Sequence, residues 1–327
     1  MTRYDTKLAR IKAGNYSRGD FIIADAKDGD MGPSIRSCGP KLAKDATFTH
    51  YRTRAEFLDQ VRAVIAQDVI DILLASASNL EILNEAGAFE GGSVKSAFRA
   101  NDATDIWVGR GAGYAKQPSR PYRTASIEAS RRQSDLGLYS ITFNNDLDAD
   151  YHSQLAFLDF VDDASDNDFN YFLEVFNPNV DTGIDPDLQP YYVNDCICRT
   201  LAGLTRAQRP QFLKIAYNGP KALDELASYD PDLVVGVLGG GAGTARDTFE
   251  LIHQAEKYGA RVALFGRKIN LAEDPLAMVK LMRAVADGEV APEEAVKAYH
   301  GALSASGQRP LRSLEDDARI TEKVLMG

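Results

Sequence analysis

Two charged residues stand inside apolar, strand-like runs of the chain. Lys214 lies in FLKIAY (212–217), and Glu174 lies one run earlier, in YFLEVF (171–176). Burial disfavours the ammonium form of a lysine, and a neutral amine is the nucleophile that attacks a carbonyl carbon to give a Schiff base. A carboxylate beside that amine can transfer protons. The alternative is an inner salt bridge with a purely structural role.

A glycine-rich segment follows a later run and opens a helix-like stretch. In GVLGGGAGTARD (236–247), Gly240 and Gly241 permit close approach of the backbone to a ligand, and a helix N-terminus supplies free N–H groups for an anion. The next run ends in FGRKIN, with Gly266 and Arg267. A guanidinium matches the geometry of phosphate oxygens. These residues predict a phosphate site.

Asp25 ends the first run, FIIAD, where a carboxylate can face a barrel mouth or simply begin a turn. The long segment that follows, 26–40, is rich in Gly and Pro and is typical of a lid or substrate loop. No pair of histidines is placed as neighbouring metal ligands, so we expect neither a metal nor another cofactor. The four histidines are His50, His152, His253 and His300.

These residues must be positioned by eight strand-like runs that alternate with helix-like stretches. Eight such units predict an α/β protein with a single (β/α)8 TIM barrel, and a doubly wound open sheet is the competing fold. We expect one domain over 1–327, with the barrel at about 20–290 and an extension at each end. Thr53 and Glu56 form an expected capping box at the start of a helix. The runs are 21–25, 69–75, 105–109, 138–144, 171–176, 212–217, 233–238 and 261–266.

The composition excludes several classes of partner. The 327 residues include 37 Lys+Arg and 47 Asp+Glu, a net charge of −10, which argues against a nucleic-acid or anionic-membrane surface. No apolar run approaches the ~18 residues of a membrane span, and the N-terminus lacks the apolar stretch of a signal peptide. Three cysteines are too few for a disulfide framework. We therefore expect a cytoplasmic protein, and a homo-oligomer as the usual state of such barrels.

The order and spacing of the motifs resemble those of a known family from about residue 20 to 290. SITFNNDLDAD, YFLEVFNP, FLKIAY, LGGGAGTARDTFELI and LFGRKIN are similar to strands four to eight of the class I, Schiff-base aldolases of the deoxyribose-phosphate and tagatose-1,6-bisphosphate aldolase superfamily. The tagatose-bisphosphate branch is the most similar in layout. The resemblance implies a Schiff-base lysine at Lys214, a proton-transferring glutamate at Glu174 and a first-strand aspartate at Asp25. It also implies phosphate contacts at Gly240, Gly241, Gly266 and Arg267.

The chain departs from that branch at positions that touch the substrate. Ser140 stands where the branch usually has a lysine, and Lys27 stands where it has an arginine. Loss of a cation at Ser140 predicts that 1,6-bisphosphates are poor substrates, although Lys27 or Arg110 could restore the charge. KIAYNG is also similar to archaeal-type fructose-bisphosphate aldolases, in which a tyrosine near the sixth strand takes part in acid–base chemistry. That comparison makes Tyr217 a further catalytic candidate.

The predicted function is that of a class I aldolase, an aldehyde-lyase that cleaves or forms a carbon–carbon bond in a phosphorylated ketose or related carbonyl compound. The imine supplies the electron sink, so the chemistry needs no metal ion. Two alternatives remain open from sequence. One is another lysine-dependent lyase or acyl-transfer reaction on the same barrel, and the other is a sugar-phosphate-binding barrel with a regulatory role and little turnover.

Overall fold

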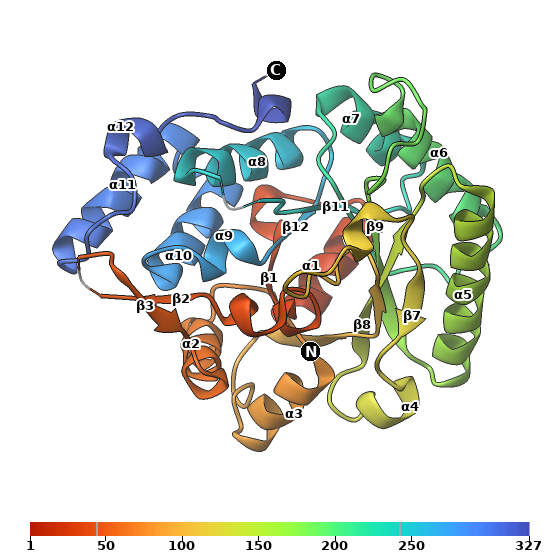
Figure 1. Ribbon diagram of the computed structural model, residues 1–327, viewed down its shortest axis with the longest axis horizontal. Coiled ribbons are helices and arrows are strands. Elements are labelled where there is room, and N and C mark those ends of the chain that lie inside the picture. Colours follow the sequence, from red (N-terminus) through yellow and green to blue (C-terminus); the bar gives the residue numbers. More distant parts are fainter. Residues whose placement is uncertain (44, 242, 327) are drawn as a thin grey trace.

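The centre of the molecule is a closed barrel of eight parallel strands (Figure 1). The computed structural model describes residues 1–43, 45–241 and 243–326. The order around the barrel is β1-β12-β11-β10-β9-β8-β5-β4, which confirms the predicted TIM barrel. The barrel strands are β1 (Ile22–Lys27), β4 (Ile72–Ala75), β5 (Lys95–Arg99), β8 (Leu136–Thr142), β9 (Asn170–Phe176), β10 (Leu213–Ile215), β11 (Val235–Leu238) and β12 (Val262–Phe265).

Helices surround this barrel, and further helices precede and follow it, as the sequence predicted. The expected capping box is confirmed, because Thr53 and Glu56 cap the start of α2 reciprocally. The helices are α1 (Arg3–Lys12), α2 (Arg54–Gln67), α3 (Ala77–Glu85), α4 (Ile127–Ser130), α5 (Leu147–Asp166), α6 (Gln189–Ala202), α7 (Pro220–Tyr229), α8 (Ala245–Lys257), α9 (Arg267–Asn270), α10 (Pro275–Ala286), α11 (Pro292–Ala305) and α12 (Leu314–Asp317).

The third barrel strand is not the predicted one. We expected residues 105–109, but the strand is β5, and residues 105–109 belong to a loop at the mouth. Two of the apolar side chains that suggested a strand there, Trp107 and Val108, are solvent-exposed, and Trp107 stacks on Tyr114 with ring centroids 5.0 Å apart. β5 was missed because the residues on its inward face, Lys95, Ala97 and Arg99, are two charged residues and one small one.

The interior of the barrel is apolar toward the amino ends of the strands, called the lower end, and polar toward their carboxyl ends, called the upper end. Ala97, Leu138, Phe172 and Phe212 belong to the buried cluster inside the strands, and the last two rings stack 4.5 Å apart. Side chains alternate along a strand, so residues two positions further on face inward as well. On four adjacent strands, these next inward residues are Arg99, Ser140, Glu174 and Lys214.

The lower end of the barrel is held together by a buried carboxylate. Asp71 precedes β4 and is fully buried. Its oxygens lie 2.8 Å from Arg3 Nε, 3.1 Å from Lys7 Nζ and 2.6 Å from Arg283 Nη2, and one of them accepts the backbone N–H of Ile23 at 2.8 Å. Because these partners come from α1, α10 and β1, one carboxylate joins the first helix and a late helix to the barrel.

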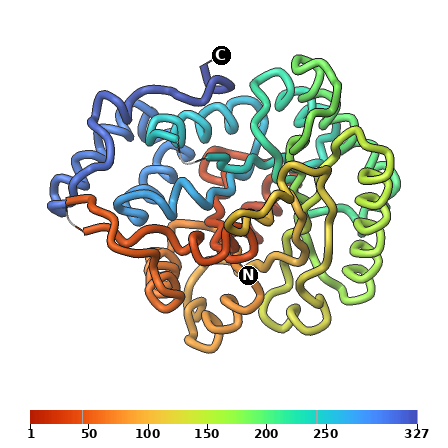
Figure 2. The backbone as a smooth tube through the Cα atoms, in the orientation of Figure 1, coloured from red at the N-terminus to blue at the C-terminus, as the bar shows by residue number. Residues whose placement is uncertain are grey.

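Two short hairpins and two 3-10 turns lie at the upper end. The hairpins pair β2 (Pro40–Leu42) with β3 (Phe48–Tyr51) and β6 (Asn101–Ala103) with β7 (Pro121–Arg123), and the turns are Gly29–Met31 and Ser34–Cys38. Arg36 Nη2 donates to the carbonyl oxygen of Val108 at 2.7 Å, so the first loop touches the 104–120 loop. Figure 2 shows these red and yellow-brown segments beside each other near the middle of the view.

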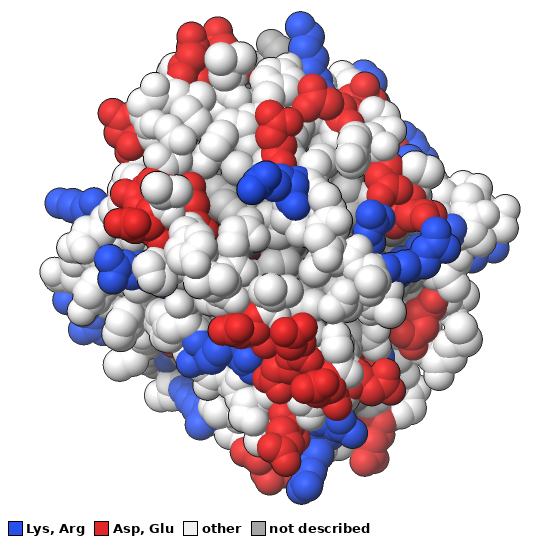
Figure 3. All heavy atoms as spheres, turned by 90° about the vertical axis from the view of Figure 1, so that its right-hand side faces the viewer, with Lys and Arg blue, Asp and Glu red and all other residues white. Residues whose placement is uncertain are grey.

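The surface over α5 and α6 carries both signs of charge. On the face drawn in Figure 3, blue basic and red acidic side chains are interleaved, with a gathering of acidic groups in its lower half. α5 alone contributes Asp148, Asp150, Asp159, Asp162, Asp163 and Asp166. Among the described helices, none combines the length and the apolar composition needed to cross a bilayer.

Substitution of Asp71 tests the contribution of the lower ionic cluster to stability. In the Asp71→Ala variant, Arg3, Lys7 and Arg283 lose a shared buried counter-ion, so we expect a loss of about 3–5 kcal/mol in the free energy of unfolding. Asp59→Ala is the control, since Asp59 is exposed and its one ion pair within the described residues is with Arg62 on the same helix, and we expect a loss below about 0.5 kcal/mol. Urea unfolding measures both. Equal effects would contradict this role of Asp71.

Candidate active site

Lys214 and Glu174 meet inside the upper part of the barrel. They occupy the same register position on the adjacent strands β10 and β9, and Lys214 Nζ forms an ion pair with Glu174 Oε1. Both side chains are almost fully buried. The two residues that the sequence singled out are therefore in direct contact at the carboxyl ends of the barrel strands, the end at which barrel enzymes carry their chemistry.

The other oxygen of Glu174 is held by two donors. Ser140 Oγ, on the neighbouring strand β8, donates to Glu174 Oε2 at 2.7 Å, and Arg99 Nη2 donates to the same oxygen at 3.1 Å. Arg99 Nη1 also donates to Ser140 Oγ at 2.8 Å. This arrangement fixes the plane of the carboxylate and leaves Oε1 directed at the lysine.

Asp28 completes the site as a second carboxylate. It follows β1, and its Oδ2 lies 2.5 Å from Arg99 Nε. Burial opposes its ionisation, but the charges of Arg99 and Lys214 outweigh burial and hold the pKa of Asp28 below its ordinary value. Burial would likewise weaken the Arg99 cation, yet Asp28 and Glu174 raise the pKa of Arg99. The layer thus contains two cations and two carboxylates in alternation.

The prediction for Asp25 and Lys27 is wrong, because both side chains face away from the barrel interior. Ile22, Ala24 and Ala26 on β1 belong to the inner cluster, so the alternate residues point to the surrounding helices. Asp25 Oδ2 lies 3.1 Å from Lys27 Nζ, and Lys27 also bonds to Asn270 at the end of α9.

The Asp25–Lys27 pair is buried between the barrel and its helices. Burial raises the pKa of Asp25 to about 6, partly offset by the attraction of Lys27, and burial lowers the pKa of Lys27. Asp28, three residues after Asp25, has the inward position that the sequence analysis gave to Asp25. A strand buried on both faces carries no polarity pattern that distinguishes them.

Tyr217 also lies outside the constellation. Its hydroxyl donates to Gln254 Oε1 on α8 at 2.7 Å, and its ring packs in the cluster between the barrel and the helices. Burial raises its pKa. Tyr217 faces outward, as Ile215 does, so the structure places it in the packing between the barrel and its helices and not beside Lys214.

In the glycine-rich segment, N–H groups that could bind an anion lie in the loop, before the start of α8. Gly240 and Gly241 border open space, and among the described residues neither N–H donates a hydrogen bond. The first N–H of α8, however, is already satisfied, since Ala245 N donates to Asp317 Oδ1 at 2.8 Å. Asp247 caps the same helix end through the backbone N–H of Thr244 at 3.0 Å. Two of the N–H groups in the first turn of α8, those of Ala245 and Asp247, are therefore bonded within the chain and are not available to an anion.

Arg267 and Gly266 lie at the end of β12, next to the first strand. A Cβ on Gly266 would approach the carbonyl oxygen of Ala26 to 3.0 Å, so this position favours glycine. Arg267 is exposed, and within the described part of the chain its guanidinium makes no ion pair. One free guanidinium and two free N–H groups thus lie at the ends of β11 and β12, the positions at which barrels commonly bind phosphate.

Ser140 stands where the tagatose-bisphosphate branch usually has a lysine. A positive charge is nevertheless present beside Ser140, and it comes from Arg99 on another strand. Arg99 on β5 reaches Ser140 and Glu174, whereas Lys27 faces the helices and Arg110 is exposed. The argument from Ser140 for a missing positive charge is therefore wrong. Its premise failed because β5 was assigned to the wrong segment, which left Arg99 unnoticed.

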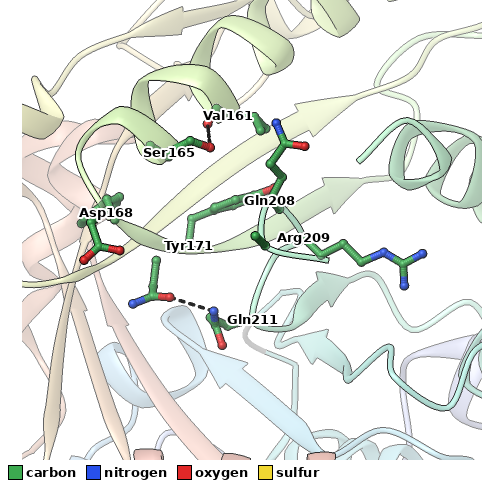
Figure 4. Close-up of a pocket in the computed structure, with 11 residues that line it drawn as sticks. Val161, Ser165, Asp168, Tyr171, Gln208, Arg209 and Gln211 are labelled. Atoms are coloured by element: carbon green, nitrogen blue, oxygen red, sulfur yellow. Dashed lines mark hydrogen bonds between the residues drawn. The ribbon is translucent and has the colours of Figure 1, made fainter. Parts of the chain in front are cut away.

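Two cavities lie at the opposite end of the barrel from this site. One, of about 190 Å³, is lined by residues of α5, the start of β9 and the segment before β10 (Figure 4). In it Tyr171 donates to the carbonyl oxygen of Gln208 at 2.7 Å, and Gln211 donates to Asn170 at 2.8 Å. The other, of about 270 Å³, lies between α1 and the starts of β5 and β8. Neither contains Lys214 or Glu174.

No cluster of three or more potential metal ligands occurs among the residues that the structure describes. His300, for instance, pairs with Asp317 at 3.0 Å, and the three cysteines are free and partly buried.

Comparisons with solved structures identify the class of barrel. An archaeal fructose 1,6-bisphosphate aldolase covers 87% of this chain and 99% of its own, with a TM-score of 0.62 and 16% identity. Another archaeal structure, with the catalytic lysine covalently bound to the carbinolamine intermediate, matches with a TM-score of 0.63, 16% identity and coverage of 87% and 100%. An aldolase from Slackia heliotrinireducens gives 0.66, 12% identity and coverage of 92% and 90%. The chain thus has the fold of the class I fructose-bisphosphate aldolases.

Sequence comparisons add nothing to that assignment. No family model matches the chain, and a search of curated protein sequences finds no match.

A further buried carboxylate lies beside the site and gives a pH-dependent test. Asp102, on β6, bonds to Tyr122, and burial raises the pKa of Asp102 to about 6, although Arg99 acts in the opposite direction. Because this pKa is raised, the folded state keeps the proton up to higher pH than the unfolded state does. The contribution of Asp102 to stability is therefore lost as pH rises from about 4 to about 6.

The Asp102→Asn variant cannot ionise at this position. We expect its free energy of unfolding, relative to the unsubstituted protein, to increase as pH rises from about 4 to about 6 and to level off above. Chemical unfolding at several pH values measures the difference, and Asp59→Asn, at an exposed position of α2, is the control, with no such trend expected. A difference that is flat or falls with pH would contradict the raised pKa.

Proposed function

We propose that this protein is a class I aldolase in which Lys214 forms a Schiff base with the ketone of a phosphorylated ketose. The observation that carries the proposal is the contact between Lys214 Nζ and Glu174 Oε1 inside the barrel, with the second oxygen of Glu174 fixed by Ser140 and Arg99. The fold shared with Schiff-base aldolases supports it. A purely structural ion pair would not require this position at the catalytic end of the strands.

Glu174 has the position needed to make the amine nucleophilic. The carboxylate takes a proton from the Lys214 ammonium, and the neutral amine then attacks the ketone carbon to give a carbinolamine. The same proton returns to the carbinolamine hydroxyl, which leaves as water and yields the iminium. Arg99 and Ser140 keep the carboxylate in one orientation during both transfers.

Cleavage uses the iminium as the electron sink. A carboxylate removes the proton of the hydroxyl on the carbon that becomes the aldehyde, the adjacent carbon–carbon bond breaks, and its electron pair forms the enamine. Protonation of the enamine carbon and hydrolysis of the imine release the ketone and regenerate Lys214. Glu174 and Asp28 are the two inward carboxylates available for these steps, and Asp28 takes the part that the sequence analysis gave to Asp25.

Phosphate would bind at the ends of β11 and β12. The N–H groups of Gly240 and Gly241 and the guanidinium of Arg267 are the donors there, with Gly266 allowing close approach. Binding energy from a phosphate remote from the reacting bond orients the ketone against Lys214.

The first test removes the amine but keeps the charge. Lys214→Arg preserves a cation for Glu174, but a guanidinium does not deprotonate and forms no imine. We expect kcat for ketose-phosphate cleavage to fall by at least ~10⁴-fold in both Lys214→Arg and Lys214→Ala, a nucleophile's scale of contribution. Tyr217→Phe is the control and should retain kcat within about threefold. Substantial turnover by folded Lys214→Arg would overturn the Schiff-base mechanism.

The second test concerns phosphate. Arg267→Ala removes a charge-assisted contact of about 2–3 kcal/mol, so we expect KM for phosphorylated ketoses to rise by about 30- to 150-fold. Unphosphorylated analogues should change little. Arg206→Ala is the matched control, because Arg206 is an exposed arginine paired with Asp232 ahead of β10, at the other end of the barrel. If both kinds of ligand weaken equally in Arg267→Ala, Arg267 has no specific role toward phosphate.

A further inference from the structure

Two amide side chains at the mouth of the barrel present polar atoms without partners. Within residues 1–43, 45–241 and 243–326, Nδ2 of Asn144 and Oδ1 of Asn179 are buried and make no hydrogen bond. The amide orientations are fixed by their other atoms. Asn144 Oδ1 accepts the backbone N–H of Asn179 at 3.0 Å, and Asn179 Nδ2 donates to the carbonyl oxygens of Ala115 and Gln117 at 3.1 and 2.7 Å.

The two residues are joined by the bond from the Asn179 backbone to the Asn144 side chain, and within the described residues they offer one free donor and one free acceptor. Flipping either amide would set like groups against each other and lose those bonds. A buried polar atom left unpaired is costly, and in native structures it commonly marks the place of a ligand or an ordered water. A hydroxyl group has the chemistry that both atoms need, because it can accept from Asn144 Nδ2 and donate to Asn179 Oδ1.

The position of the pair relates it to the reacting bond. Asn144 follows β8. Tyr139, Ile141 and Phe143 pack between the barrel and its helices, so the alternate residues, Ser140 and Asn144, face the barrel interior. Asn144 is only 2% exposed, and Asn179 follows β9.

Around the barrel, β10 with Lys214 separates β9 and β8 on one side from β11 and β12 on the other. A ketose joined to Lys214 and held by its phosphate near Arg267 would direct its other half toward Asn144 and Asn179.

The charges around the amide pair disfavour a second phosphate. Asp150 accepts the backbone N–H of Asn144 at 2.8 Å, and Asp105 accepts the hydroxyl of Thr142 at 2.9 Å. The inward cation Arg99 is already bonded to Asp28, Ser140 and Glu174. These two carboxylates repel an anion but accept an uncharged hydroxyl, and Lys116, which lies between the two residues whose carbonyls bind Asn179, is exposed to solvent.

We propose that Asn144 and Asn179 bind an uncharged hydroxyl on the half of the substrate that leaves as the aldehyde, so that the substrate is a ketose monophosphate phosphorylated on the ketone side. This inference rests on the proposed aldolase function and adds the chemical class of the substrate. The expected preference for a single phosphate rests on Asn144, Asn179 and the neighbouring carboxylates, and it does not depend on Ser140.

The test compares turnover of whole ketose phosphates with imine formation by a ligand that contains only the ketone half. Ketohexose 1-phosphates and the matching 1,6-bisphosphates, of fructose and tagatose, measure turnover. Dihydroxyacetone phosphate, which has no aldehyde half, measures imine formation by borohydride trapping on Lys214. We expect a higher kcat/KM for the 1-phosphates in the unsubstituted protein.

The Asn144→Asp variant keeps the acceptor for Asn179 N–H and loses the free donor. We expect its kcat/KM for the 1-phosphates to fall by about tenfold, while trapping of dihydroxyacetone phosphate changes less than twofold. Asn167→Asp, at the end of α5, is the control and should change neither.

The outcomes separate the two claims. Absence of any trapped adduct in the unsubstituted protein overturns the aldolase proposal and this inference with it. An adduct together with a higher kcat/KM for the bisphosphates overturns this inference alone. The same holds if turnover and trapping fall equally in Asn144→Asp, which is the result that a structural or water-binding role predicts.

Discussion

The constraint on which the site depends is charge neutrality inside the barrel. An ionised side chain is strongly disfavoured in a low-dielectric interior unless it has an opposite charge and hydrogen bonds beside it. Here Lys214 and Arg99 are matched by Glu174 and Asp28, and Ser140 fills the remaining hydrogen-bonding position. Each residue comes from a different part of the barrel wall or its first loop, so the closure of the barrel and the position of that loop are required to assemble the layer.

That requirement explains which parts of the site could be predicted. Lys214 and Glu174 were visible because each interrupts an apolar run, and their contact follows from adjacent strands in equal register. Arg99 was not visible, because its strand contains few large apolar residues and resembled a loop. Asp25 and Asp28 were confused because β1 is buried on both faces, so its sequence does not show which side faces inward.

The phosphate region shows a different limit of local motifs. The glycine loop and α8 have the sequence of an anion site, but the first N–H of α8 is occupied by Asp317, more than 70 residues later in the chain. That contact brings the C-terminal extension onto the top of the barrel, where Gln254 Nε2 also donates to the carbonyl oxygen of Leu325 at 2.9 Å. No pattern within 236–247 could reveal this competition. Within the described part of the chain, the N–H groups of Gly240 and Gly241 and the guanidinium of Arg267 make no hydrogen bond.

The most direct measurement of the central claim is the mass of the protein after borohydride reduction in the presence of a ketose phosphate. We expect one added substrate-derived group per chain, and peptide mapping should locate it on Lys214, since reduction converts the imine to a stable secondary amine. The Lys214→Arg variant should remain unlabelled under the same conditions. A labelled protein with the adduct on any other lysine, or no adduct with any ketose phosphate that the protein turns over, would contradict the account.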